Sequence, residues 1–248
     1  MWLQLLVLLL SVGAAAATVL LGKLDQPRNL KLLTAFTGAY LIGLTCLHLL
    51  PEVFAHAHHA EDGPRWQIGA FILGGFFIQV VLENFSRGLE HGHAHKPHGP
   101  LPFSMLAGLC LHAFLEATPL GAAAMHHDHG HAHTHNTSLL LTAIAIHKYP
   151  VGIVLLAMLL QSGITRAKAF MLLGVFAAMA PLGAVAGQLP MLAGHHHWLL
   201  AMVIGIFMHV STTILFESEE GHRFNFRKGT AIALGALLAI LSILAPLH

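Results

Sequence analysis

The chain has 248 residues, of which 56% are hydrophobic and only 9% are charged, and its mean hydropathy is +0.70. A water-soluble domain of this length carries many more charged residues, so this composition excludes a soluble globular protein and predicts a polytopic membrane protein. The formal net charge of +1 gives no broad basic surface, so a nucleic-acid partner is not expected.

Eight apolar runs are each long enough to cross a bilayer, which takes about 20 helical residues. They predict an all-α bundle that occupies residues 1–248 as a single transmembrane domain, with histidine-rich loops at about residues 86–100 and 125–137. No lysine or arginine precedes the first run, which favours a retained span over a cleaved secretory signal. The runs are Trp2 to Gly22, Leu32 to Pro51, Trp66 to Asn84, Leu101 to Met125, Leu139 to Leu160, Ala169 to Leu189, Trp198 to Phe216 and Thr230 to Leu247.

The basic residues between these spans are distributed unevenly. Of the 12 lysines and arginines, all except Arg65 and Lys148 follow spans one, three, five or seven. Because short cytoplasmic loops collect lysine and arginine, this asymmetry predicts that both termini lie outside the cytoplasm. Short loops and the lack of a soluble domain indicate a bacterial inner membrane.

Several ionisable residues in or beside the apolar runs are candidates for function. A charged side chain at the bilayer centre costs about 2.5–3.5 kcal/mol, so such residues usually serve an ion pathway or a metal. His112 and Glu116 project together from span four, because positions i and i+4 share one face of a helix. A structural pair between helices is the alternative. The candidates are His48 and Glu52 in and after span two, His112 and Glu116 in span four, His147 and Lys148 in span five, and His209 and Glu217 in and after span seven.

Proline and glycine add two further signals. Pro119 and Pro150 would bend spans four and five, and such bends are tolerated where the irregular backbone lines a cavity. The sequence therefore indicates a passage between these helices.

Small residues in spans three and six suit close approach of helices, although ordinary membrane composition explains them equally well. These residues are Gly69, Gly74, Gly75, Gly183 and Gly187.

Most of the 22 histidines fall into loop clusters. Alternating His-x-His tracts are typical of transition-metal capture, because imidazole suits zinc, copper and nickel. The charge distribution predicts that the cluster at residues 91–98 is cytoplasmic and that the cluster at 126–135 is external. A solvated polar loop without a metal is the alternative for each cluster.

Four short segments resemble signatures of the ZIP family of divalent-metal transporters. The resemblance covers essentially the whole chain and includes eight spans, external termini and a histidine-rich loop between spans three and four. It implies an eight-helix bundle in which spans one to three and six to eight are inverted repeats around spans four and five. It is also compatible with a homodimer. The segments are HLLPE (His48 to Glu52), HAFLEA (His112 to Ala117), HKYPVG (His147 to Gly152) and APLGA (Ala180 to Ala184).

The resemblance implies that His112 and Glu116 are ligands of the transported metal and that His147 completes the site from the next span. Many family members have a glutamate at the position of Val151, one turn after His147, so one family ligand is missing here. Two imidazoles and one carboxylate suit zinc, and the missing hard ligand disfavours manganese and ferrous iron. His48, Glu52 and Glu217 are further candidate metal ligands, as stations along the route. His209 is a candidate ligand as well, and a hydrogen bond to a neighbouring helix is its alternative role.

A second metal position found in some bacterial members is not expected in this chain. The corresponding residues are Ala113, Lys148 and Ala180. An ammonium group at Lys148 would repel a second cation, so one ion should bind at a time. Pairing of Lys148 with Glu116 in the absence of metal, or snorkelling towards the membrane surface, is the alternative role, and the sequence leaves its charge state open.

These observations predict transport of divalent cations into the cytoplasm through one intramembrane site. Zinc is the expected substrate, with cadmium, ferrous iron and manganese as further candidates. An enzyme is not expected. The alternatives are a membrane zinc sensor that does not transport, and an intramembrane zinc hydrolase in which the fourth zinc position holds an activated water.

Overall fold

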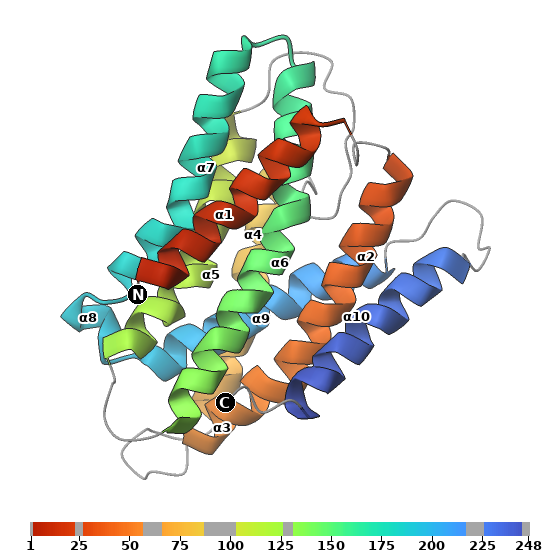
Figure 1. Ribbon diagram of the computed structural model, residues 1–248. Helices are drawn as coiled ribbons and strands as arrows, with labels where there is room; N and C mark the ends of the chain where they lie inside the picture. Colours follow the sequence, from red (N-terminus) through yellow and green to blue (C-terminus); the bar gives the residue numbers. More distant parts are fainter. Residues whose placement is uncertain are drawn as a thin grey trace.

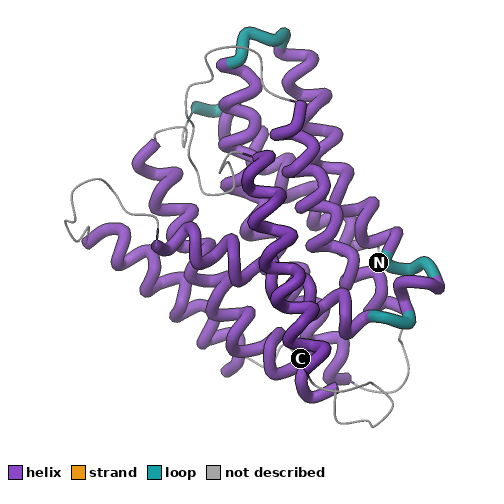
Figure 2. The backbone as a smooth tube through the Cα atoms, turned by 180° about the vertical axis from the view of Figure 1, so that it is seen from behind, coloured by secondary structure: helices purple, strands orange, loops and turns teal. Residues whose placement is uncertain are grey.

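The computed structural model describes residues 2–22, 27–56, 66–86, 103–125, 131–216 and 226–244. All regular secondary structure in these ranges is helical, which confirms the predicted all-α class for this part of the chain (Figures 1 and 2). The elements are α1 (Trp2–Leu20), α2 (Pro27–Leu44), the π-helical segment η1 (Thr45–Leu49), α3 (Leu50–His56), α4 (Trp66–Ser86), α5 (Phe103–Met125), α6 (His131–Gln161), α7 (Arg166–Ala186), α8 (Pro190–Ala193), α9 (His196–Phe216) and α10 (Phe226–Leu244).

Seven helical segments within the described ranges are long and apolar enough to cross a membrane. They overlap the first seven predicted runs. The eighth predicted run overlaps α10, a helix of 19 residues that is not among the seven, so the count of eight spans is not confirmed. The seven segments are Trp2–Leu20, Asn29–Ala55, Trp66–Phe85, Phe103–Met125, Thr137–Gln161, Arg166–Ala186 and His196–Phe216.

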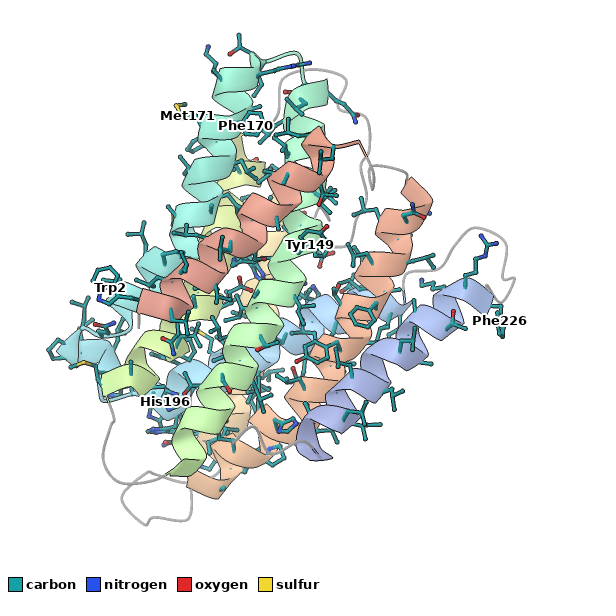
Figure 3. The ribbon with its side chains drawn as sticks, viewed as in Figure 1. Trp2, Tyr149, Phe170, Met171, His196 and Phe226 are labelled. Carbon is teal, nitrogen blue, oxygen red and sulfur yellow. The ribbon has the colours of Figure 1, made fainter. Side chains whose placement is uncertain are left out.

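The outer faces of these helices are apolar. Trp2, Met171 and Phe226 point away from the bundle and are exposed (Figure 3). Large apolar side chains are exposed along α1, α4, α7 and α10 as well. A soluble monomer rarely exposes apolar surface this extensive, whereas lipid tails solvate it without cost. The surface therefore agrees with the membrane setting that the composition predicts.

The helices associate in two groups. In the first group α5 packs against α7 and α1 against α6, and α6 and α7 also contact each other. In the second group α2 packs against α10 and α4 against α9, and α2 also contacts α9 (Figure 1). The groups meet where α4 and α9 touch α5 and where α2 touches α6. Helices α5 and α6, which carry the candidate metal ligands, therefore lie at the boundary between the groups.

Glycine permits the close packing of α5 on α7. A Cβ atom added at Gly183 would lie 2.1 Å from the carbonyl oxygen of Phe114, and one added at Gly187 would lie 2.0 Å from that of Thr118. The same relation holds between α4 and α9, where a Cβ at Gly75 would lie 1.9 Å from the carbonyl oxygen of Met202. Three of the five predicted packing glycines thus stand at helix contacts. The remaining two, Gly69 and Gly74, have no neighbouring atom within 4 Å of an added Cβ, so they agree with the alternative of ordinary membrane composition.

The proline in α5 leaves a carbonyl group without its usual helical partner. Pro119 has no N–H to donate to the carbonyl oxygen of Leu115, four residues earlier. The hydroxyl of Thr118 donates to that oxygen at 2.8 Å instead. Pro150 and Pro181 lie inside α6 and α7 in the same way. All three helices near the candidate site therefore have an interrupted backbone hydrogen-bond ladder within the apolar interior.

We expect Gly183→Ala to destabilise the protein, because the added methyl group cannot fit unless α5 and α7 move apart. Overpacking of this kind costs about 1–3 kcal/mol. Gly174→Ala is the matched control on the same helix, since nothing lies within 4 Å of a Cβ there. Thermal unfolding of the purified protein in detergent should show a lower midpoint for Gly183→Ala only. Equal midpoints for the two variants would contradict the packing argument.

Candidate metal centre

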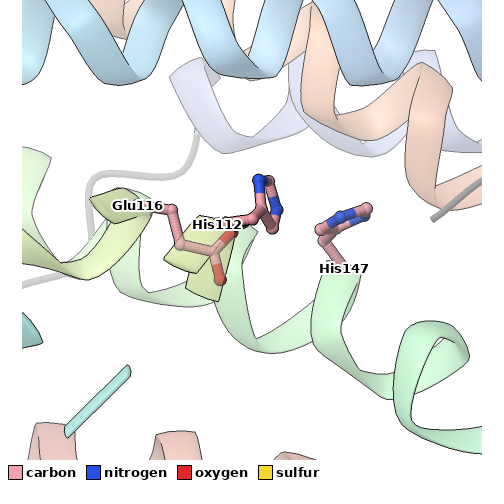
Figure 4. A group of neighbouring side chains, drawn as sticks. All are labelled: His112, Glu116 and His147. Atoms are coloured by element: carbon pink, nitrogen blue, oxygen red, sulfur yellow. Dashed lines mark ion pairs between the residues drawn. The ribbon is translucent and has the colours of Figure 1, made fainter. Parts of the chain in front are cut away.

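Three side chains meet inside the boundary between the helix groups. His112 and Glu116 come from α5, and His147 comes from α6 (Figure 4). One potential ligand atom from each residue lies within 4.8 Å of the others. All three side chains are buried, with exposed fractions of 2%, 0% and 2%. Among the residues that the structure describes, this is the one such group of three or more histidine, cysteine or acidic side chains.

Local helix geometry accounts for half of this arrangement. His112 and Glu116 are four residues apart on α5, so both project from the same face. The Nε2 atom of His112 lies 3.3 Å from Oε2 of Glu116. His147 reaches the same place from the neighbouring helix, with its ring centroid 6.0 Å from that of His112 and the ring planes at 77°. The three predicted ligands are therefore brought together.

The spacing between the nearest atoms of His112 and Glu116 is compatible with zinc. At bond lengths of about 2.0–2.1 Å, two ligand atoms of a tetrahedral zinc site lie roughly 3.3 Å apart. The separation between His112 and Glu116 has this value, 3.3 Å. Two imidazole nitrogens and one carboxylate oxygen form a donor set that zinc accepts, and a fourth position is left for water or another ligand.

Lys148 stands on the other side of the carboxylate. Its Nζ atom forms an ion pair with Oε1 of Glu116 and lies 5.1 Å from the ring centroid of Phe176 on α7. Lys148 is 2% exposed, so the pair is shielded from water. The two oxygens of Glu116 are thereby divided, with Oε2 towards the histidines and Oε1 towards the ammonium group. The pairing of Lys148 with Glu116 is one of the roles expected from the sequence.

Three positions at which the family pattern predicts further ligands, Ala113, Val151 and Ala180, carry no donor atoms in their side chains. Val151 is buried in the apolar cluster that also contains Ala113. Ala180 is buried in the neighbouring apolar cluster. Among the described residues, the group that could hold a metal ion here is therefore His112, Glu116 and His147.

His48 and Glu52 lie apart from this group. His48 is in the π-helical segment η1, and its Nε2 atom is 3.0 Å from the hydroxyl oxygen of Ser242 on α10. Glu52 follows on α3 and is half-buried. Short π-helical segments occur frequently at functional sites. The structure therefore leaves these two residues as separate candidates on the second helix group.

His209 also lies apart from the group and has a partner of its own. Its Nε2 atom pairs with Oε2 of Glu83 on α4, and its ring meets the ring of Phe76 edge-on at 4.9 Å. Glu217 lies outside the described residues, as do residues 87–100 and 126–130 of the two predicted histidine-rich loops. The second loop is shorter than predicted, because α6 begins at His131.

Sequence analysis missed two polar residues of α4. Gln79 is fully buried, and its Oε1 atom lies 2.8 Å from Nδ1 of His112. Glu83, one turn later, is the partner of His209. Both stand in the middle and last part of a mostly apolar span, and their polarity was the available signal. Their spacing of four residues places them on one face of α4, towards the other helices.

Comparison with known proteins gives a consistent result. A family model described as ZIP Zinc transporter matches residues 96–243, which is more than half of the chain. Zinc transporter ZIP5 of Homo sapiens is 27% identical over 283 residues, covering 84% of this chain and 50% of that protein. Zinc transporter SLC39A7 of Mus musculus is 31% identical over 87 residues, covering 29% of this chain and 18% of that protein.

A third relative matches over a similarly short stretch. Zinc transporter ZIP13 of Bos taurus is 32% identical over 91 residues, covering 33% of this chain and 22% of that protein. The chain thus spans half or less of the length of these relatives. The family match and the seven candidate spans together show that the chain is an integral membrane protein that belongs to the ZIP zinc transporter family.

Proposed function

We propose that the protein transports divalent transition-metal cations across the membrane, with zinc as the main substrate, through a single site formed by His112, Glu116 and His147. The observation that supports this most directly is the convergence of three buried ligand atoms within 4.8 Å, from two helices at the centre of a bundle. Burial of an imidazole pair and a carboxylate in a membrane interior is costly, so a functional use is the simplest explanation. Family membership supports the same substrate class.

Three protein ligands suit a transported ion better than a permanently held one. Conduction requires binding that is strong enough to admit the ion and weak enough to release it. A closed site with four protein ligands is typical of structural zinc, whereas three ligands leave one position for exchange. The site would therefore hold zinc while a fourth ligand, water or an incoming side chain, changes.

The ion pair between Lys148 and Glu116 supports the binding of one ion at a time. Because Nζ of Lys148 lies against Oε1 of Glu116, that side of the carboxylate already faces a positive charge. A second divalent cation there would have to displace the ammonium group or lie beside it in the apolar interior. Repulsion between like charges is strong in such a medium of low dielectric constant. The first cation would meet Oε2, on the side of the histidines.

We also propose that α10 is an eighth span and that the bundle contains inverted repeats. In such a repeat α1 corresponds to α7, α2 to α9, α4 to α10 and α5 to α6. The contacts between helices follow this correspondence. The contact of α1 with α6 matches that of α7 with α5, the contact of α2 with α10 matches that of α9 with α4, and the contact of α2 with α6 matches that of α9 with α5. An exchange of spans one to three with six to eight around the central pair would produce these matched contacts.

The direction proposed is into the cytoplasm, with both termini outside. In this orientation His48 and Glu52 lie at the external end of their span, where they would receive the ion before the central site. His209 lies in the cytoplasmic half of span seven, and Glu217 follows that span, so both would meet the ion afterwards. The positive charges of the alternate loops support the orientation.

Removal of the site ligands should abolish transport. We expect His112→Ala and Glu116→Gln to lower zinc-65 uptake into proteoliposomes by roughly tenfold or more, since even partners that only orient a metal ligand are worth 10–100-fold. His195→Ala is the control, because His195 is exposed at the corner before α9 and its Nδ1 atom lies 3.0 Å from the carbonyl oxygen of Met191. Unchanged uptake by both site variants would exclude this site. Zinc binding without flux by the unaltered chain would indicate a sensor.

Restoration of the missing carboxylate should broaden metal selectivity. Val151 is buried one turn after His147 on α6, so Val151→Glu places an acidic group beside the site. Hard oxygen ligands favour manganese and ferrous iron relative to the present set. We expect metal-resolved uptake to show increased transport of both ions relative to zinc, while the shape-matched control Val151→Ile keeps the original ratio. If Val151→Glu left the transport of manganese and ferrous iron relative to zinc unchanged, the missing carboxylate would not explain the selectivity.

A further inference from the structure

The buried amide of Gln79 lies against one ring nitrogen of His112. The two residues meet through Oε1 of Gln79 and Nδ1 of His112, at 2.8 Å. An amide oxygen can only accept a hydrogen bond, so this contact is a hydrogen bond when Nδ1 carries the proton and donates it. In a neutral imidazole the lone pair is then on Nε2. This atom lies 3.3 Å from Oε2 of Glu116, on the side of the proposed metal position.

We propose that Gln79 is a positioning residue for zinc: it holds the ring and the tautomer of His112 so that the lone pair of Nε2 faces the ion. This inference rests on the proposed function of His112 as a zinc ligand. Histidines that bind metals nearly always donate their other ring N–H to an acceptor, which fixes the ring and raises its basicity. In this chain the acceptor comes from α4, a helix of the second group, whereas the ligands come from the first.

The chemistry of the acceptor sets the strength of the site. A carboxylate at this place would raise the basicity of His112 further and would add a second negative charge near Glu116. Zinc would then bind more tightly and leave more slowly. The neutral amide orients the ligand without this added charge, which suits a site that must release its ion. Gln79 is therefore a determinant of affinity as well as of orientation.

The burial of Gln79 favours hydrogen bonding of its amide within the protein. Its side chain is fully buried, and an amide without partners in an apolar interior costs several kcal/mol in transfer experiments. Neighbouring residues of α4 such as Phe77 and Val81 are apolar and exposed on the outer face. The amide is thus directed inward, where α4 contacts α5.

Three variants of the purified full-length chain test the proposal. Gln79→Met keeps the size of the side chain but provides only a weak acceptor, whereas Gln79→Glu keeps an oxygen acceptor. Gln67→Met changes the same residue type on the same helix, away from the site. We expect Gln79→Met to weaken zinc binding by about 10–100-fold in a competition titration. We expect Gln79→Glu to bind zinc at least as tightly as the unaltered chain but to release it more slowly, with reduced maximal uptake. Gln67→Met should leave both measurements unchanged.

A spectroscopic measurement separates orientation from general damage. In zinc-free buffer, the ¹⁵N spectrum of histidine-labelled protein should show His112, identified as the signal lost in His112→Ala, as the tautomer protonated at Nδ1. Gln79→Met should shift it towards the other tautomer, and Gln79→Glu should restore it. The proposal is overturned if Gln79→Met leaves the tautomer and the zinc affinity unchanged, or if Gln79→Glu weakens binding as much as Gln79→Met. If instead His112→Ala binds zinc normally, the proposed function fails, while the tautomer measurement still reports on Gln79.

Discussion

A carboxylate enclosed in an apolar bundle is the constraint on which the rest of the site depends. Glu116 is fully buried, and an isolated charge there would be very costly. Its two oxygens face different groups, the ammonium group of Lys148 at Oε1 and the imidazole of His112 at Oε2. This division gives one carboxylate two tasks, because one oxygen compensates a fixed charge and the other faces the proposed cation position.

The backbone around Glu116 is adapted to bring these partners close. Glycines on α7 lie close to backbone carbonyl oxygens of α5, so backbone contacts help to hold the helix that carries two of the proposed ligands. The hydroxyl of Thr118 meets the carbonyl group that Pro119 leaves without a partner. Rigid support of this kind matters for a metal site, since donor atoms must keep their spacing within a few tenths of an ångström.

The two helix groups contribute different parts of the centre. Helices α5 and α6 provide the three proposed ligands and Lys148, whereas α4 provides the amide that meets His112. The same face of α4 holds His209 through Glu83, one turn further along. The contact between Gln79 and His112 joins the two groups, so we expect the strength of the proposed metal site to depend on how the groups pack against each other.

The sequence by itself determined the features that depend on local periodicity. Apolar runs of sufficient length predicted the helices, and the spacing of four residues placed His112 and Glu116 on one face, because both follow from the repeat of a single helix. Only the tertiary structure decided which helices meet. The approach of His147, the pairing of Lys148 with Glu116, and the contacts of Gln79 and Glu83 join residues that are between 31 and 126 positions apart. Gly69 and Gly74 illustrate the same limit, since glycine indicates where helices can approach, but the packing of the whole bundle selects where they do.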